Sequence, residues 1–111
     1  DDTVLVKVQG LSMSPLLNDG DVITMFHKRG ARSRFMKKGL VYLVEYKGGY
    51  TVKKYNTRPA SAQEIEDGAS YISRQDGKAK VRVLQSINPD FPEIVITDEA
   101  EWIAWVDPKK L

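Results

Sequence analysis

A short glycine turn between two runs of strand-forming residues is the strongest constraint on what this chain can fold into. Residues 40–46 (LVYLVEY) and 50–55 (YTVKKY) are rich in β-branched, aromatic and other apolar side chains, and Lys47-Gly48-Gly49 separates them. Glycine accepts the positive φ angles that a tight hairpin turn requires. The two runs therefore predict an antiparallel β-hairpin.

Further short runs of the same kind indicate that the whole chain is mainly β. In residues 3–9, Val4, Val6 and Val8 alternate with polar side chains, which is typical of a strand with one buried face. A loop is expected to follow at 10–20. The remaining strands are expected at 21–27, 79–85, 93–97 and 102–106, with one helical patch within 60–73.

Two segments interrupt this pattern. Residues 27–38 carry six basic side chains and no acid, which is typical of a solvated loop, so no site is assigned to them. Residues 56–78 mix Gly, Pro, Ser and acidic side chains, and they are expected to form an insertion with a short helix and a turn. We expect this insertion to decorate a core that does not need it.

Composition excludes several classes of protein and of active site. With 111 residues, 41% of them hydrophobic, the range 1–111 is expected to form one folded domain. A net charge of +2 is too small for a stand-alone nucleic-acid binder. The chain has no Cys, which excludes disulfides, thiolate zinc sites and cysteine nucleophiles. Any catalysis must therefore use an oxygen nucleophile with lysines or carboxylates.

Ser12 is the candidate nucleophile. It follows Gly10 and Leu11 directly after the first expected strand. A serine on such a turn is exposed, and nearby backbone N–H groups are free to stabilise an oxyanion. A hydroxyl is a weak nucleophile at neutral pH, so Ser12 also needs a base. An ordinary turn serine is the alternative interpretation.

The candidate bases are His27 and the pair Lys53-Lys54. No Asp-His spacing supports a triad around His27, which is expected to be an ordinary histidine at a strand end. A lysine base must be neutral, and only about 0.04% of a lysine with the ordinary pKa of ~10.4 is neutral at pH 7. Burial lowers this pKa. Adjacent side chains of a strand point to opposite faces, so one of the two lysines can be buried, but the pattern leaves open which one. Two surface lysines remain the alternative.

Four ordered motifs resemble the LexA, UmuD and phage-repressor family of self-cleaving serine peptidases. The segment 8–15 (VQGLSMSP) with 19–21 (DGD) is similar to the family's nucleophile segment, and 51–54 (TVKK) is similar to the segment that supplies its general-base lysine. The other two motifs are 84–92 (LQSINPDFP) with Ile94 and Ile96, which resembles a later strand entry, and 102–106 (WIAWV), which resembles the last strand and subunit contact.

The resemblance implies a fold, an activity and the residues that perform it. The implied fold is mainly β, a LexA or signal-peptidase-like β-barrel-type fold of short, highly twisted strands with one helical insertion. The implied activity is that of a serine endopeptidase that cleaves its own chain by a Ser-Lys dyad. Ser12 would be the nucleophile and Lys53 the base, with Lys54 pointing away. The backbone N–H groups of Ser12 and Met13 would form the oxyanion hole.

The resemblance also implies partners. The chain would be the C-terminal catalytic and dimerisation domain of a LexA-like or phage-type transcriptional repressor, and it would form a homodimer. Trp102 and Trp105 are candidates for the dimer interface, where aromatic residues are enriched, and equally for the core. An activated RecA filament would stimulate cleavage at a small-residue–Gly bond upstream, and operator DNA would be bound by an N-terminal domain that this chain lacks.

No cofactor, metal or membrane contact is implied, and no apolar run reaches the length of a membrane span. We therefore expect a cytoplasmic protein of which this chain is one part. The chain contains no Ala-Gly or Cys-Gly bond, so the bond that the family usually cleaves is expected outside residues 1–111.

Two alternatives to a repressor remain. The same fold can serve as a non-catalytic dimerisation module or as a UmuD-like polymerase accessory protein. A signal-peptidase relative is the second alternative, because Ser12-Met13-Ser14-Pro15 resembles the first box of that enzyme. The absence of an acidic, glycine-rich motif after the lysine strand and of a membrane anchor disfavours this reading.

Overall fold

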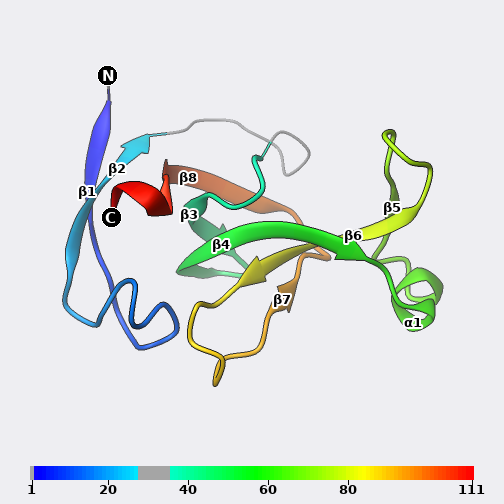
Figure 1. Ribbon diagram of the computed structural model, residues 1–111, viewed down its shortest axis with the longest axis horizontal. Coiled ribbons are helices and arrows are strands. Elements are labelled where there is room, and N and C mark those ends of the chain that lie inside the picture. The colour runs from blue at the N-terminus through cyan, green and yellow to red at the C-terminus, as the bar shows by residue number, and fades with distance from the viewer. Residues whose placement is uncertain (1, 28–35) are drawn as a thin grey trace.

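An antiparallel sheet of eight strands organises the computed structural model, which describes residues 2–27 and 36–111 (Figure 1). This confirms the mainly-β class. The elements are β1 (Thr3–Lys7), β2 (Val22–His27), β3 (Val41–Tyr46), β4 (Gly49–Pro59), α1 (Ala62–Glu66), β5 (Tyr71–Ile72), β6 (Ala79–Gln85), β7 (Ile94–Val95), β8 (Ala100–Val106) and the 3-10 helix η2 (Pro108–Lys110). Within the described ranges, no helix is long and apolar enough to cross a membrane.

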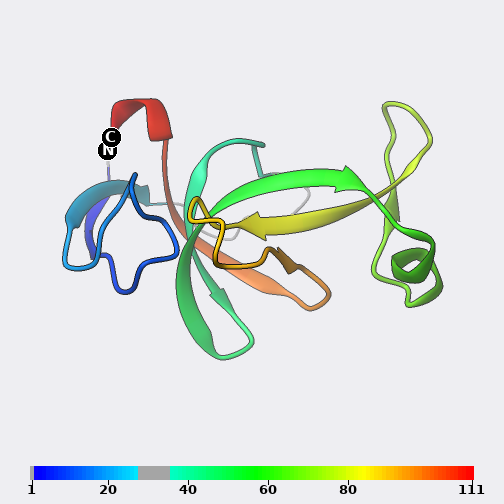
Figure 2. The same cartoon turned by 60° about the horizontal axis from the view of Figure 1, so that its bottom comes forward.

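The last long strand lies between strands from the first half of the chain. The hydrogen-bonded order is β1-β2-β8-β3-β4-β6-β5, and β7 pairs with β6. In the described residues this path runs from β1 to β5 without closing into a ring. The sheet is strongly coiled, and α1 and β5 lie at the end of the molecule remote from β1 and β2 (Figures 1 and 2).

The predicted central hairpin is present, but its turn lies one residue earlier than the glycine pair indicated. Strands β3 and β4 pair up to Tyr46 and Gly49, which leaves Lys47 and Gly48 as the two turn residues. Both have positive φ, 51° and 81°, as the two central residues of a type I′ turn require. Gly49 therefore begins β4, and Lys47 adopts a backbone conformation that a residue with a Cβ rarely adopts.

The expected insertion at 56–78 begins as sheet rather than as loop. Strand β4 continues to Pro59, and its residues from 54 onward pair with β6. Helix α1, shorter than the expected patch, starts with a capping box between Ser61 and Glu64 and buries no residue. Arg58 joins Glu64 and Glu93 in ion pairs of 2.7 Å each. Most of the basic segment expected as a solvated loop, residues 28–35, lies outside the described residues.

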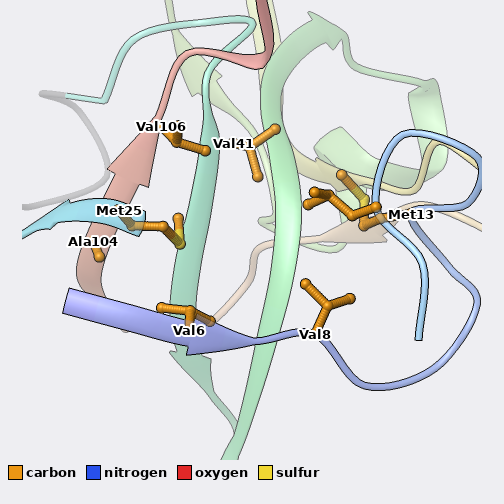
Figure 3. Close-up of a cluster of buried hydrophobic side chains, with 8 residues drawn as sticks. Val6, Val8, Met13, Met25, Val41, Ala104 and Val106 are labelled. Atoms are coloured by element: carbon orange, nitrogen blue, oxygen red, sulfur yellow. The ribbon is translucent and has the colours of Figure 1, made fainter. Parts of the chain in front are cut away.

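Two clusters of side chains form the core. The first, shown in Figure 3, lies where β1 crosses in front of the middle strands of the coiled sheet. It consists of Val6, Val8, Met13, Leu17, Met25, Val41, Ala104 and Val106. Met13 and Leu17 come from the loop after β1, so this loop is anchored in the core by its own side chains.

Aromatic rings dominate the second cluster. Trp102 packs edge-on against Tyr42 and Tyr55, with ring centroids 5.1 Å and 5.4 Å away. Its side chain is only 1% exposed. The expectation that Trp102 could contribute to a dimer interface is therefore wrong, because the fold of a single chain already buries this side chain.

The strained turn residue gives a stability prediction. Replacing Lys47 by Asn should raise the free energy of unfolding by about 0.5–1 kcal/mol, because Asn tolerates positive φ and Asn-Gly favours a type I′ turn. Lys47 also forms an exposed ion pair with Asp98 at 3.6 Å. Such a pair contributes little to the free energy of unfolding, so its loss in the variant costs little. Urea unfolding measures the change. Lys47→Ala is the control, because it loses the same contacts and keeps the strain; equal stability of the two variants would contradict the prediction.

Candidate active site

The loop that carries Ser12 is closed at its base by backbone hydrogen bonds. The N–H of Val8 donates to the carbonyl of Asp21 at 2.7 Å, and the N–H of Gly20 donates to the carbonyl of Val8 at 2.8 Å. Between these points, Met13 and Leu17 are buried in the first core cluster. The loop therefore has a fixed base and two apolar anchors, and Ser12 stands directly before one of them.

Two carboxylates hold the loop from one side. Asp19 Oδ1 accepts a hydrogen bond from the N–H of Gly10 at 2.7 Å, and Asp21 Oδ2 accepts one from the N–H of Asn18 at 2.8 Å. Hydrogen bonds from backbone N–H groups to carboxylates are stronger than those between neutral groups. The Asp19-Gly20-Asp21 motif thus has a structural role in shaping the turn around the candidate nucleophile.

Asn88 holds the same loop from a distant part of the chain. Its backbone N–H donates to the carbonyl of Ser12 at 2.9 Å, and its side-chain Nδ2 donates to the carbonyl of Leu11 at 3.0 Å. Sequence reasoning placed Asn88 in the motif 84–92 but gave it no role. Nothing in the spacing indicates that a residue 77 positions away binds Leu11.

Strand β4 brings Lys53 to Ser12. The side chain of Lys53 is 8% exposed, whereas the neighbouring Lys54 is half-buried on the opposite face of the strand. The structure therefore selects one member of the lysine pair for the interior, and it is the member that the resemblance indicated.

The amine of Lys53 is surrounded by three oxygen atoms. Lys53 Nζ donates to Ser12 Oγ at 2.7 Å, to Thr51 Oγ1 at 2.8 Å and to the carbonyl of Val52 at 3.3 Å. An ammonium can give one proton to each oxygen. A neutral amine can give two protons, to Thr51 and Val52, and accept the Ser12 hydroxyl proton with its lone pair. The same geometry therefore suits both protonation states.

Burial lowers the pKa of Lys53 from its ordinary value, because removal from water disfavours the charged form. The site is a cleft of about 330 Å³, and none of the described residues that line it is a carboxylate. No negative charge in the described cleft lining therefore offsets the desolvation of the Lys53 ammonium, whose only compensation there is the three neutral oxygen atoms. The residues lining the cleft are Val6, Lys7, Val8, Gln9, Ser12, Met13, Leu43, Tyr50, Thr51, Val52 and Lys53.

The structure places the other candidate residues as follows. Among the described residues, the backbone N–H groups of Ser12 and Met13 donate to no protein acceptor. His27 ends β2, whereas the loop with Ser12 precedes the start of that strand, so the two residues are at opposite ends of β2. The structure does not bring His27 to Ser12.

The part of the chain that the structure describes also contains no cluster of His and carboxylate groups suited to a metal ion.

The buried lysine predicts a pH dependence of stability. Between the lowered pKa of folded Lys53 and the ordinary value near ~10.4, the unfolded chain binds more protons than the folded chain. The free energy of unfolding should therefore rise with pH through this window, by about 1.4 kcal/mol for each unit by which folding lowers the pKa. Lys53→Met keeps most of the side-chain volume and should lack this rise.

Urea unfolding of the wild type and of Lys53→Met from pH 7 upward provides the measurement. Lys54→Met is the matched control, since it removes the adjacent lysine and leaves Lys53 in place, so it should keep the wild-type rise. The difference between wild type and Lys53→Met isolates Lys53 from tyrosines that titrate in the same range. Parallel pH profiles of these two proteins would contradict the burial of a titrating amine.

A comparison with protein families gives a match. The family model described as Peptidase S24-like matches residues 1–63, more than half of the chain, and this range includes Ser12 and Lys53. No curated protein and no solved structure gives a significant match. The family match confirms the resemblance to LexA, UmuD and the phage repressors, and the chain belongs to the Peptidase S24-like family of serine peptidases.

Proposed function

We propose that this protein is a serine peptidase that cleaves its own chain, with Ser12 as nucleophile and Lys53 as general base. The observation that carries the proposal is the 2.7 Å contact between Lys53 Nζ, on a buried side chain, and Ser12 Oγ. A general base must lie within hydrogen-bond distance of the proton that it removes, and its pKa must be near the working pH. Lys53 lies within hydrogen-bond distance of the Ser12 hydroxyl, and its burial lowers its pKa in the direction of the working pH.

The first half of the reaction forms an acyl-enzyme. Neutral Lys53 takes the proton from Ser12 Oγ as that oxygen attacks the carbonyl carbon of the scissile bond. The carbonyl oxygen becomes an oxyanion, which the N–H groups of Ser12 and Met13 stabilise. The Lys53 ammonium then gives its proton to the leaving nitrogen, the C–N bond breaks, and Thr51 Oγ1 keeps the amine oriented.

Hydrolysis completes the cycle. Lys53, neutral again, takes a proton from a water molecule that attacks the acyl carbon, and a second oxyanion forms between the same N–H groups. Its collapse breaks the ester bond, and the ammonium returns a proton to Ser12 Oγ. The products are a new carboxylate and a new amine, and both side chains return to their starting states.

The cleft suits an extended peptide. Strand β1 stands at the end of the hydrogen-bonded order in the described residues, and residues 6–9 line the cleft. An extended segment can add to such an edge by main-chain hydrogen bonds. Small-residue–Gly bonds are the substrate class that the family resemblance implies, and we propose that the cleaved bond lies outside residues 1–111.

The biological role that fits this activity is that of a LexA-like or phage-type repressor. In this proposal the chain is the C-terminal catalytic and dimerisation domain, and a DNA-binding domain elsewhere in the protein contacts the operator. Cleavage separates the two, and repression fails because the avidity of the dimer for two half-sites is lost. An activated RecA filament acts as the stimulus, in the cytoplasm.

Dimerisation has a candidate surface on the face of β1, β2 and β8 that points away from the first core cluster. This outer face carries the exposed side chains of Leu5, Val22 and Phe26, and beside Phe26 lies the half-buried Trp105, which also packs against the second core cluster. The rings of Phe26 and Trp105 stack with centroids 4.9 Å apart, and Phe26 is 41% exposed. A patch with two aromatic rings is typical of the centre of a protein interface.

Cleavage tests the catalytic proposal directly. The full-length protein should give two fragments, and the rate should rise about tenfold per pH unit below the lowered pKa of Lys53 and then level off, because the rate follows the neutral amine. Mass spectrometry of the fragments at several pH values measures the rate and locates the bond. Ser12→Ala and Lys53→Met should give no fragments.

Lys54→Met is the control for this experiment and should cleave like the wild type. If Lys54→Met is inactive and Lys53→Met is active, the assignment of the base is wrong. If no fragments form at any pH, even with an activated RecA filament, the non-catalytic dimerisation module replaces the proposal.

The outer face predicts the oligomeric state. Phe26→Asp should shift the full-length protein from dimer to monomer in sedimentation velocity, because it places a charge at the centre of the patch. Ile72→Asp is the matched control, since Ile72 is exposed at the remote end of the sheet on β5 and its replacement should leave the dimer intact. A Phe26→Asp protein that remains dimeric would exclude this face as the interface.

A further inference from the structure

Asn88 binds two consecutive peptide groups around the proposed nucleophile. Its Nδ2 donates to the carbonyl of Leu11, and its backbone N–H donates to the carbonyl of Ser12. The side-chain Oδ1 of Asn88 accepts a hydrogen bond from the N–H of Asp90 at 2.9 Å, which fixes the orientation of the amide. A single residue of the loop between β6 and β7 thus contacts the backbone on both sides of the Ser12 Cα atom.

The two carbonyls share their peptide groups with the two proposed oxyanion donors. The carbonyl of Leu11 belongs to the same planar unit as the N–H of Ser12, and the carbonyl of Ser12 belongs to the same unit as the N–H of Met13. Both units are trans, and in a trans peptide the C=O and N–H bonds point in opposite directions. A group that holds the carbonyl end therefore also sets the direction of the N–H end.

Asn88 lies outside the cleft, whereas Ser12 and Met13 line it. The two N–H groups point away from Asn88, because they oppose the carbonyls that it binds. Among the described residues neither N–H donates to a protein acceptor, so both are available to a substrate oxygen.

We propose that Asn88 is a positioning residue for the oxyanion hole: it fixes the direction of the Ser12 and Met13 N–H groups by binding the opposite ends of their peptide units. This inference rests on the proposed self-cleavage. The side chain acts on the Leu11–Ser12 unit and the backbone acts on the Ser12–Met13 unit. Asn88 touches neither the substrate nor Lys53.

The expected fall in cleavage rate is smaller than the fall caused by removing an oxyanion donor. Removal of one oxyanion donor costs about 10²–10³ in rate. Asn88→Ala leaves both N–H groups in place and removes only its own bond to the carbonyl of Leu11. That carbonyl then keeps one donor, the N–H of Ser14 at 3.1 Å, so the N–H of Ser12 becomes less well directed. We expect the maximal cleavage rate to fall about 10- to 100-fold. The apparent pKa of the pH–rate profile should not change, because the surroundings of Lys53 are intact.

The experiment compares pH–rate profiles of self-cleavage in the full-length wild type, Asn88→Ala and Asn88→Asp, at a temperature where circular dichroism shows each protein folded. Asn88→Asp keeps the shape of the side chain and the contact with Asp90 but has no Nδ2 donor. Asn56→Ala is the matched control. It removes an amide that donates to Gln85 Oε1 at 3.3 Å on the β4–β6 arm, and it should cleave at the wild-type rate.

A lower maximal rate at an unchanged apparent pKa in both Asn88 variants, with Asn56→Ala unaffected, supports the inference. Wild-type rates in the Asn88 variants would overturn it and leave the proposed function in place. A lower rate accompanied by a shifted pKa, or loss of the fold in both variants, would also overturn it, because Asn88 would then hold the whole loop. Absence of cleavage in the wild type would overturn the proposed function and this inference together.

Discussion

The contact between Lys53 and Ser12 requires the rest of the structure to bury an amine and to hold it at hydrogen-bond distance from a hydroxyl. An amine loses hydration when it is buried, and no carboxylate lines the described cleft to compensate. Three oxygen atoms at 2.7–3.3 Å replace water around Nζ, and they come from β4 and from the loop after β1. The site therefore depends on two separate segments meeting at hydrogen-bond distance, and the sheet supplies that precision.

The loop with Ser12 is irregular backbone whose position is fixed by side chains from several directions. Asp19 and Asp21 bind N–H groups on one side, Asn88 binds carbonyls on the other, and Met13 enters the core below. Backbone groups that no strand satisfies are thus satisfied by side chains. The N–H groups of Ser12 and Met13 are among those in the described loop that donate to no protein acceptor, and both residues line the cleft, where a developing negative charge would be.

Much of the fold could be predicted from the sequence, because the evidence for it was local. The strand at the start of the chain and the hairpin of β3 and β4 follow from side-chain period and backbone sterics, although the exact turn residues, Lys47 and Gly48, did not. The pattern at Lys53-Lys54 indicated opposite faces but not which face is inside, because that depends on the register of β4 against its neighbours. The role of Asn88 and the burial of Trp102 were not predictable for the same reason, since both arise from contacts between segments far apart in the chain.

The separation of the two site residues along the chain makes any such activity conditional on folding. Ser12 and Lys53 are 41 positions apart, and they meet only when β1, β3 and β4 have assembled. In an unfolded copy the lysine returns to water and is protonated at neutral pH, so it has no free lone pair. Under the proposed activity, a nascent or damaged chain would therefore not react, and the tertiary structure itself would prevent premature cleavage.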